Sequence, residues 1–125
     1  MDRPAEILRR HGLRPKREWG QNFLGDEALL HDIARLAVRR AGEPVVELGA
    51  GLGHLTARLL ALGAAVTAVE RDRDMARVLR AELGDRIRLL EADAAQHLGR
   101  TRPGVAAAQQ FQRQHHVLQC AQVRQ

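Results

Sequence analysis

The stretch VVELGAGLGHLT, from Val45 to Thr56, constrains the fold of this chain more than any other segment. An apolar run that reads as a buried strand is followed by three glycines at alternate positions, Gly49, Gly51 and Gly53, and then by a helix-like run. Glycine lets the backbone turn sharply and approach a ligand without a clashing Cβ. A strand, a glycine turn and a helix in this order are typical of sheets that bind a nucleotide-like cofactor.

Strands and helices alternate along the rest of the first hundred residues. Alternating strands and helices of this length predict a parallel α/β sheet. The patterns predict strands over 44–48, 65–70 and 86–92, and helices from Asp26 onward, over 54–62 and over 72–83. The residues expected on the inward faces of the first and last helices are Leu29, Ile33, Leu36, Ala37, Met75, Val78, Leu79 and Leu83.

Chemically useful residues follow each predicted strand. In parallel sheets ligands bind at the carboxyl ends of the strands, where the glycine turn, Glu70 and Asp93 all lie. A carboxylate at Glu70 can accept hydrogen bonds from both hydroxyls of a ribose, and one at Asp93 can accept from an adenine amine. Each acid could instead be a solvated strand end, but with Gly49, Glu70 and Asp93 all at strand ends we favour ligand contact.

The spacing of the glycines bears on which cofactor the turn holds. Dinucleotide dehydrogenases use G-x-G-x-x-G, whereas here the third glycine comes one residue early and His54 takes the dehydrogenase position. The pattern E-x-G-x-G-x-G, with Glu47 before the turn, resembles the first motif of S-adenosylmethionine-dependent methyltransferases. That cofactor carries a sulfonium cation instead of a pyrophosphate, so a nearby carboxylate is electrostatically favourable. A nicotinamide-dependent oxidoreductase remains the alternative for the general layout.

A further segment indicates which family of methyltransferases the chain resembles, namely KREWGQNFLGDEALL, residues 16–30. Together with ELGAGLGHLT, AVERD and EADA in the same order, it resembles the ribosomal RNA adenine-N6,N6-dimethyltransferases. The resemblance implies a Rossmann-like class I S-adenosylmethionine-dependent methyltransferase sheet, truncated after about the third or fourth strand. It implies methyl transfer from S-adenosylmethionine to N6 of adenines in small-subunit rRNA. The cofactor contacts that it implies are Asn22, Leu24, Gly49, Gly51, Glu70 and Asp93.

The chain departs from this family after about residue 99. The family positions the adenine amine with an N-L-P-Y-type motif, but this chain has no tyrosine and its only asparagine is Asn22. Near the expected place stands QQFQRQ, so no catalytic residue is carried over. The acid-free, Gln-rich tail suggests no element beyond a short strand at 105–108, and we interpret it as frameshifted or disordered. Without a fourth strand, residues 45–48 would form an unpaired apolar edge. A non-catalytic fragment that binds cofactor or rRNA is therefore a second interpretation.

Composition and charge complete the expectations. The chain has 125 residues and a formal net charge of +5, with basic residues concentrated before Trp19. We expect this basic arm to contact the phosphates of small-subunit rRNA or a pre-ribosomal small subunit, the alternative being a solvated basic tail. A single cysteine excludes an intrachain disulfide, and no metal site is expected. Without a long apolar run or a signal-peptide pattern, we expect a cytoplasmic monomer with no membrane contact. The expected organisation is a basic arm (1–20), a cofactor-binding half-domain (21–99) and an atypical tail (100–125).

Overall fold

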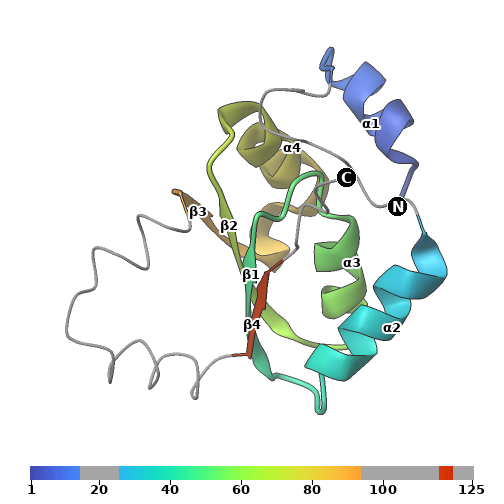
Figure 1. Ribbon diagram of the computed structural model, residues 1–125. Helices are drawn as coiled ribbons and strands as arrows, with labels where there is room; N and C mark the ends of the chain where they lie inside the picture. Colours follow the sequence, from blue (N-terminus) through green and yellow to red (C-terminus); the bar gives the residue numbers. More distant parts are fainter. Residues whose placement is uncertain (15–25, 94–115, 120–125) are drawn as a thin grey trace.

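The computed structural model describes residues 1–14 and 26–93 and the backbone of 116–119 (Figure 1). A short 3₁₀ turn, Gly84–Arg86, precedes the third strand. Among these described residues, no helix has the length and apolar character needed to cross a bilayer. In chain order the elements are α1 (Pro4–Arg10), α2 (Glu27–Ala37), β1 (Pro44–Leu48), α3 (His54–Ala61), β2 (Ala65–Glu70), α4 (Arg73–Leu83), β3 (Arg88–Glu91) and β4 (His116–Gln119).

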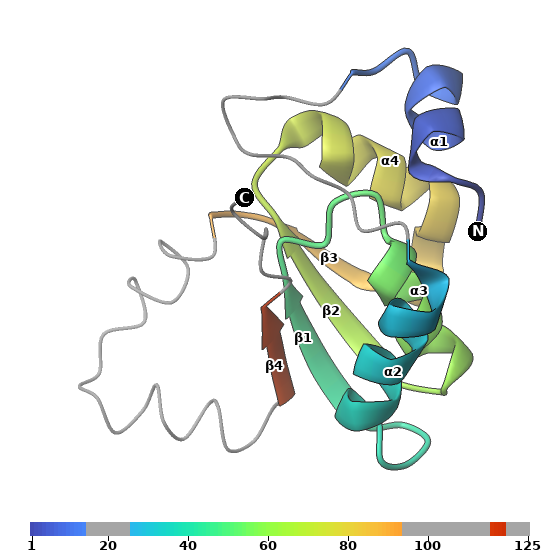
Figure 2. The same cartoon turned by 45° about the vertical axis from the view of Figure 1, so that its right-hand side comes forward.

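The four strands form one parallel sheet in the order β3-β2-β1-β4 (Figure 2). Val45 of β1 lies opposite Val66 of β2 on one side and His116 of β4 on the other. Glu70, the last residue of β2, lies opposite Glu91 at the end of β3. The carboxyl ends of β1, β2 and β3 therefore meet at one edge of the sheet. The α/β fold expected from the sequence is confirmed.

Helices α2, α3 and α4 lie on the same face of the sheet. Leu59 of α3 packs with Val45 and Val66, and Leu79 of α4 packs with Ala68. These three strand residues share a face because side chains alternate along each strand and the register pairs them laterally. A separate buried cluster occupies the opposite face of the strands, namely Val46, Leu48 and Val69.

The helices and strands agree closely with the sequence prediction, except for the start of the third strand and the buried face of α2. The strand expected over 86–92 begins at Arg88, because the 3₁₀ turn takes up the residues before it. The inward face of α2 was wrong in part, since Leu36 is 81% exposed and Leu29 is 44% exposed. The buried residues of α2 are Leu30, Ala34 and Ala37. Both sets recur at helical spacing, so the periodicity alone could not choose between them.

Strand β4 contradicts the expectation of an unpaired edge at 45–48. Its backbone pairs with β1 in parallel over four residues, with Val46 opposite Val117 and Leu48 opposite Gln119. This strand has a weak sequence signal, because HVLQ has only two adjacent apolar residues within a Gln-rich segment. The strand expected at 105–108 lies outside the described residues.

The N-terminal segment is more ordered than a basic arm. Residues 4–10 form α1, which begins with a proline and ends with Arg9 and Arg10 in its last turn. Ile7 and Leu8 are buried, and they pack with Leu52 of the glycine turn and with α4. Helix α1 therefore lies beside the carboxyl edge of the sheet.

Candidate functional site

The glycine turn between β1 and α3 uses a backbone that other residues rarely adopt. Gly49, Gly51 and Gly53 have φ angles of 73°, 59° and 93°, all in the left-handed region that favours glycine. The Gly49 N–H donates to the carbonyl of Val69, at 2.8 Å, which ties the start of the turn to the neighbouring strand. Helix α3 begins directly after Gly53, with no side chain capping its first turn.

Glu70 joins this turn to the turn that follows β2. Its Oε2 accepts a hydrogen bond from the Gly51 N–H at 2.8 Å, and its Oε1 accepts from the Asp72 N–H at 3.0 Å. The residue is only 6% exposed. A carboxylate offers about four acceptor positions, so these two bonds leave room for two more donors. The structure thus brings Glu70, Gly49 and Gly51 together, as the sequence predicted.

Asp72 continues the same chain of contacts. Its own carboxylate is fully buried and caps α4, accepting from the Asp74 N–H at 2.8 Å and from the Met75 N–H at 3.4 Å. A cap of this kind satisfies backbone donors that have no partner within the helix. The turn after β2 is therefore fixed at both ends, by Glu70 and by Asp72.

Asp93 lies two residues beyond β3 at the same edge of the sheet. Its Oδ2 is 3.9 Å from a guanidinium nitrogen of Arg71, the residue that follows Glu70. The Asp93 side chain is 36% exposed, so it is more open to solvent than Glu70. The remaining predicted cofactor contacts, Asn22 and Leu24, lie outside the described residues.

Glu47, the acid that precedes the glycine turn, is hydrogen-bonded to α3. It is fully buried, and its Oε2 accepts a hydrogen bond from the hydroxyl of Thr56 in α3 at 2.5 Å. Burial raises the pKa of Glu47 to about 7; the Thr56 hydrogen bond lowers the pKa, and the charge of Glu70 adds to the rise. Glu47 therefore links β1 to the first turn of α3, across the glycine turn. Sequence reasoning missed this pairing, because the spacing E-x₈-T has no established meaning.

No metal centre is built by the part of the chain that the structure describes. Within residues 1–14 and 26–93, no three histidine, cysteine or acidic side chains are grouped in a way that could hold a metal ion. The groups that the structure places at this edge of the sheet are backbone N–H groups and carboxylates, a set suited to the hydroxyls and amines of a nucleoside.

The sequence model of one family matches most of the chain. Residues 12–101 match the family described as ribosomal RNA adenine dimethylase. The chain belongs to this family. Membership supports the methyltransferase interpretation of the glycine turn over the nicotinamide-dependent alternative.

Individual members of the ribosomal RNA adenine dimethylase family are closely similar to this chain. The ribosomal RNA small subunit methyltransferase A of Anaeromyxobacter dehalogenans (strain 2CP-C) is 77% identical over 92 residues, which cover 74% of this chain and 32% of that protein. The protein of the same name from Myxococcus xanthus (strain DK1622) is 60% identical over 95 residues, covering 76% of this chain and 34% of that protein. The chain thus spans about a third of the length of these relatives.

A solved structure extends the likeness to the fold. The crystal structure of the 23S rRNA methyltransferase ErmE matches this chain with a TM-score of 0.55 and 31% sequence identity. The match covers 72% of this chain and 41% of that chain. The Rossmann-like methyltransferase sheet expected from the sequence is therefore confirmed over the part of the chain that matches.

The buried carboxyl of Glu47 predicts a pH-dependent stability. The pKa of Glu47 is raised from 4.5 to about 7 on folding, so the folded protein holds this proton more tightly than the unfolded chain. The resulting stabilisation is fully present below the unfolded pKa and is lost as the pH rises through the folded pKa. We expect the free energy of unfolding of Glu47→Gln, measured in denaturant, to fall less than that of the wild type between about pH 5 and about pH 8.

The matched control for this measurement is Glu91→Gln. Glu91 ends β3, which is separated from β1 by β2; it pairs with Arg80 on the surface and is 37% exposed. It should retain the pH dependence of the wild type over this range. A Glu47→Gln profile parallel to the wild-type profile would contradict the assignment of a raised pKa to Glu47.

Proposed function

We propose that this chain is the cofactor-binding part of an S-adenosylmethionine-dependent methyltransferase that modifies N6 of adenines in small-subunit rRNA, in the cytoplasm. The observation that carries the proposal is the buried Glu70 carboxylate, which is held against the glycine turn with acceptor positions to spare. The names of the close relatives, ribosomal RNA small subunit methyltransferase A, support the substrate.

The residues at this edge fit the nucleoside part of S-adenosylmethionine. The two ribose hydroxyls would donate to Glu70, and the adenine amine would donate to Asp93. Gly49 and Gly51 would let the backbone approach the ligand, since neither carries a Cβ. Asn22 and Leu24 would contact the cofactor from the N-terminal segment. When bound, S-adenosylmethionine supplies a methyl group attached to a positively charged sulfur.

Methyl transfer also needs groups that hold the target amine. An exocyclic adenine amine is a weak nucleophile, so positioning must contribute much of the rate. The N-L-P-Y-type motif is not present in this sequence, which has no tyrosine. We therefore assign cofactor binding to this chain, and methyl transfer to family members that carry the motif. Transfer of labelled methyl groups to small-subunit rRNA by the purified chain alone would contradict this division.

Substitution of Glu70 tests the cofactor site. Glu70→Gln keeps one carbonyl acceptor but replaces the other oxygen with a donor, so it cannot accept hydrogen bonds from both ribose hydroxyls. We expect S-adenosylmethionine binding, measured by calorimetry, to weaken by at least about tenfold, the scale for loss of hydrogen bonds to a charged group. Glu70→Ala should abolish binding.

Two controls accompany the Glu70 variants. Glu91→Gln changes the same residue type at the end of the neighbouring strand and should bind like the wild type. Thermal unfolding of each variant separates a lost ligand contact from a lost fold. Wild-type affinity in folded Glu70→Gln and Glu70→Ala would remove Glu70 from the site, and with it the main support for the proposal.

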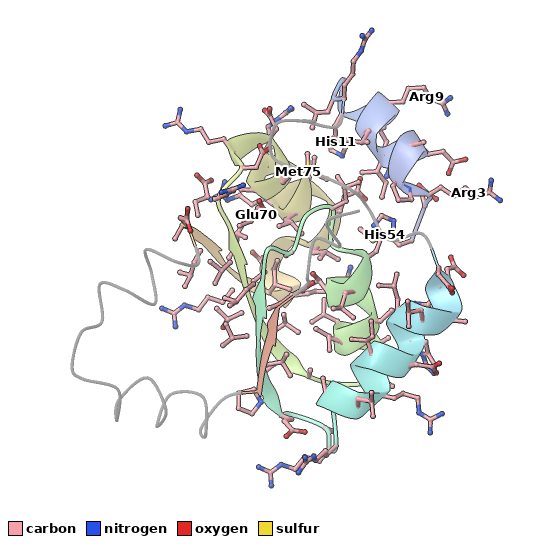
Figure 3. All side chains as sticks on the ribbon, in the orientation of Figure 1. Arg3, Arg9, His11, His54, Glu70 and Met75 are labelled. Atoms are coloured by element: carbon pink, nitrogen blue, oxygen red, sulfur yellow. The ribbon has the colours of Figure 1, made fainter. Side chains whose placement is uncertain are left out.

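The basic N-terminal segment supports an RNA partner. Arg3 and Arg9 are exposed and extend outward from α1 (Figure 3). Neither forms an ion pair with any residue in 1–14 or 26–93, whereas Arg10 is paired with Asp2 and Glu82. Arg3 and Arg9 lie next to the edge of the sheet at which the cofactor would bind. Their unpaired guanidinium groups suit contact with the phosphates of an RNA strand whose target base is brought to that edge.

The double substitution Arg3→Gln/Arg9→Gln tests the RNA surface. We expect weaker binding to a small-subunit rRNA transcript and a salt dependence whose slope is smaller by about 1 to 2, because each lost phosphate contact removes about 0.7 to 0.9 from it. Arg35→Gln/Arg40→Gln, which removes two exposed arginines away from that edge, is the control of equal charge. Equal affinities and slopes for the two double variants would show that α1 has no special part in RNA binding.

A further inference from the structure

The first residues of the chain pack directly against the glycine turn. Ile7 is fully buried and Leu8 is 6% exposed, and both pack with Leu52, which stands between Gly51 and Gly53. Leu52 is itself 1% exposed, and the glycines on either side of it both have positive φ angles. Helix α1 therefore holds the Leu52 side chain of the glycine turn in place.

A hydrogen bond makes a second contact between this segment and the turn. The Nε2 of His54, the first residue of α3, is 2.7 Å from the backbone carbonyl oxygen of Asp2 (Figure 3). A carbonyl oxygen only accepts, so His54 must donate from Nε2. Both the Nε2–H tautomer and the imidazolium can do this, so the bond does not require a charged histidine. The terminal methyl of Met1 also lies close to Gly53, 3.5 Å from the place that a Cβ would occupy.

The N-terminal segment is itself fixed to α4. Arg10 and His11 both reach Glu82, with distances of 2.6 Å from Arg10 Nη2 and 2.9 Å from His11 Nε2 to Glu82 Oε1. The hydrogen bond from Arg10 contributes most to lowering the pKa of Glu82, and the hydrogen bond from His11 contributes next. Since α4 is anchored to the sheet by its buried face, the segment rests on a rigid support.

We propose that residues 1–11 act as a brace that holds the glycine turn in its cofactor-binding conformation, with His54 as a positioning residue. Three glycines give this turn more backbone freedom than any other part of the sheet edge. Contacts that restrict it beforehand reduce the entropy lost when a ligand binds. The link to cofactor affinity rests on the proposed function, whereas the restraint of the turn does not depend on it.

Substitution of His54 tests the brace with little risk to the fold, because the residue is only half-buried. His54→Ala removes the donor to Asp2, and His54→Gln retains an N–H donor. Amide hydrogen exchange should become faster in His54→Ala at Gly51 and Gly53, whose N–H groups donate to Glu70 and to the Ala50 carbonyl. Exchange in the β2 strand should not change, and His54→Gln should restore protection of the turn.

Cofactor affinity supplies the functional readout. We expect S-adenosylmethionine to bind His54→Ala about fivefold more weakly, the loss of one hydrogen bond, and to bind His54→Gln like the wild type. His31→Ala in α2 is the control for loss of a histidine elsewhere on the helical face, and should change neither readout.

The two readouts separate the brace from the proposed function. Unchanged exchange at Gly51 and Gly53 in His54→Ala would overturn the brace, whatever the affinities. Faster exchange with unchanged affinity would overturn its link to cofactor binding. If the wild type binds no S-adenosylmethionine, the proposed function fails, while the exchange data still decide whether the segment restrains the turn.

Discussion

The carboxylate of Glu70 is the contact on which the loops at the carboxyl edge of the sheet depend. A parallel sheet brings the ends of β1 and β2 side by side, but it does not by itself fix the loops that leave them. Glu70 does so by accepting one N–H from each loop, from Gly51 and from Asp72. Asp72 in turn caps α4. Glu70 therefore holds in place both the glycine turn that leads into α3 and the aspartate that caps α4.

This arrangement restrains a turn that its three glycines would otherwise leave flexible. A glycine-rich backbone suits close approach of a ligand but has a large conformational entropy to lose. Here the turn is restrained from three sides: by Glu70, by the Glu47–Thr56 hydrogen bond that spans it, and by the packing of Leu52 under α1. Binding sites that are formed before the ligand arrives bind more tightly for the same contacts.

The parts of the fold that follow from local signals could be predicted from the sequence. Strands β1 and β2 and helix α4 are bounded by glycine, proline or a capping aspartate, and Glu70 lies where a strand must end. The missed features all depend on tertiary contacts. The buried face of α2 is set by its packing on α3, the partner of Glu47 by how α3 lies on the sheet, and the role of α1 by a hydrophobic contact with Leu52.

The pairing of β4 with β1 has a consequence for how the chain folds. The units β1-α3-β2 and β2-α4-β3 close over short connections, whereas β4 joins β1 from a distant part of the sequence. Closing a longer connection costs more chain entropy, so we expect the three-stranded unit to form before β4 joins it. Until β4 arrives, the backbone groups of Val45–Leu48 face solvent along one edge. Any delay at that stage leaves a nascent chain that is prone to pair with its neighbours.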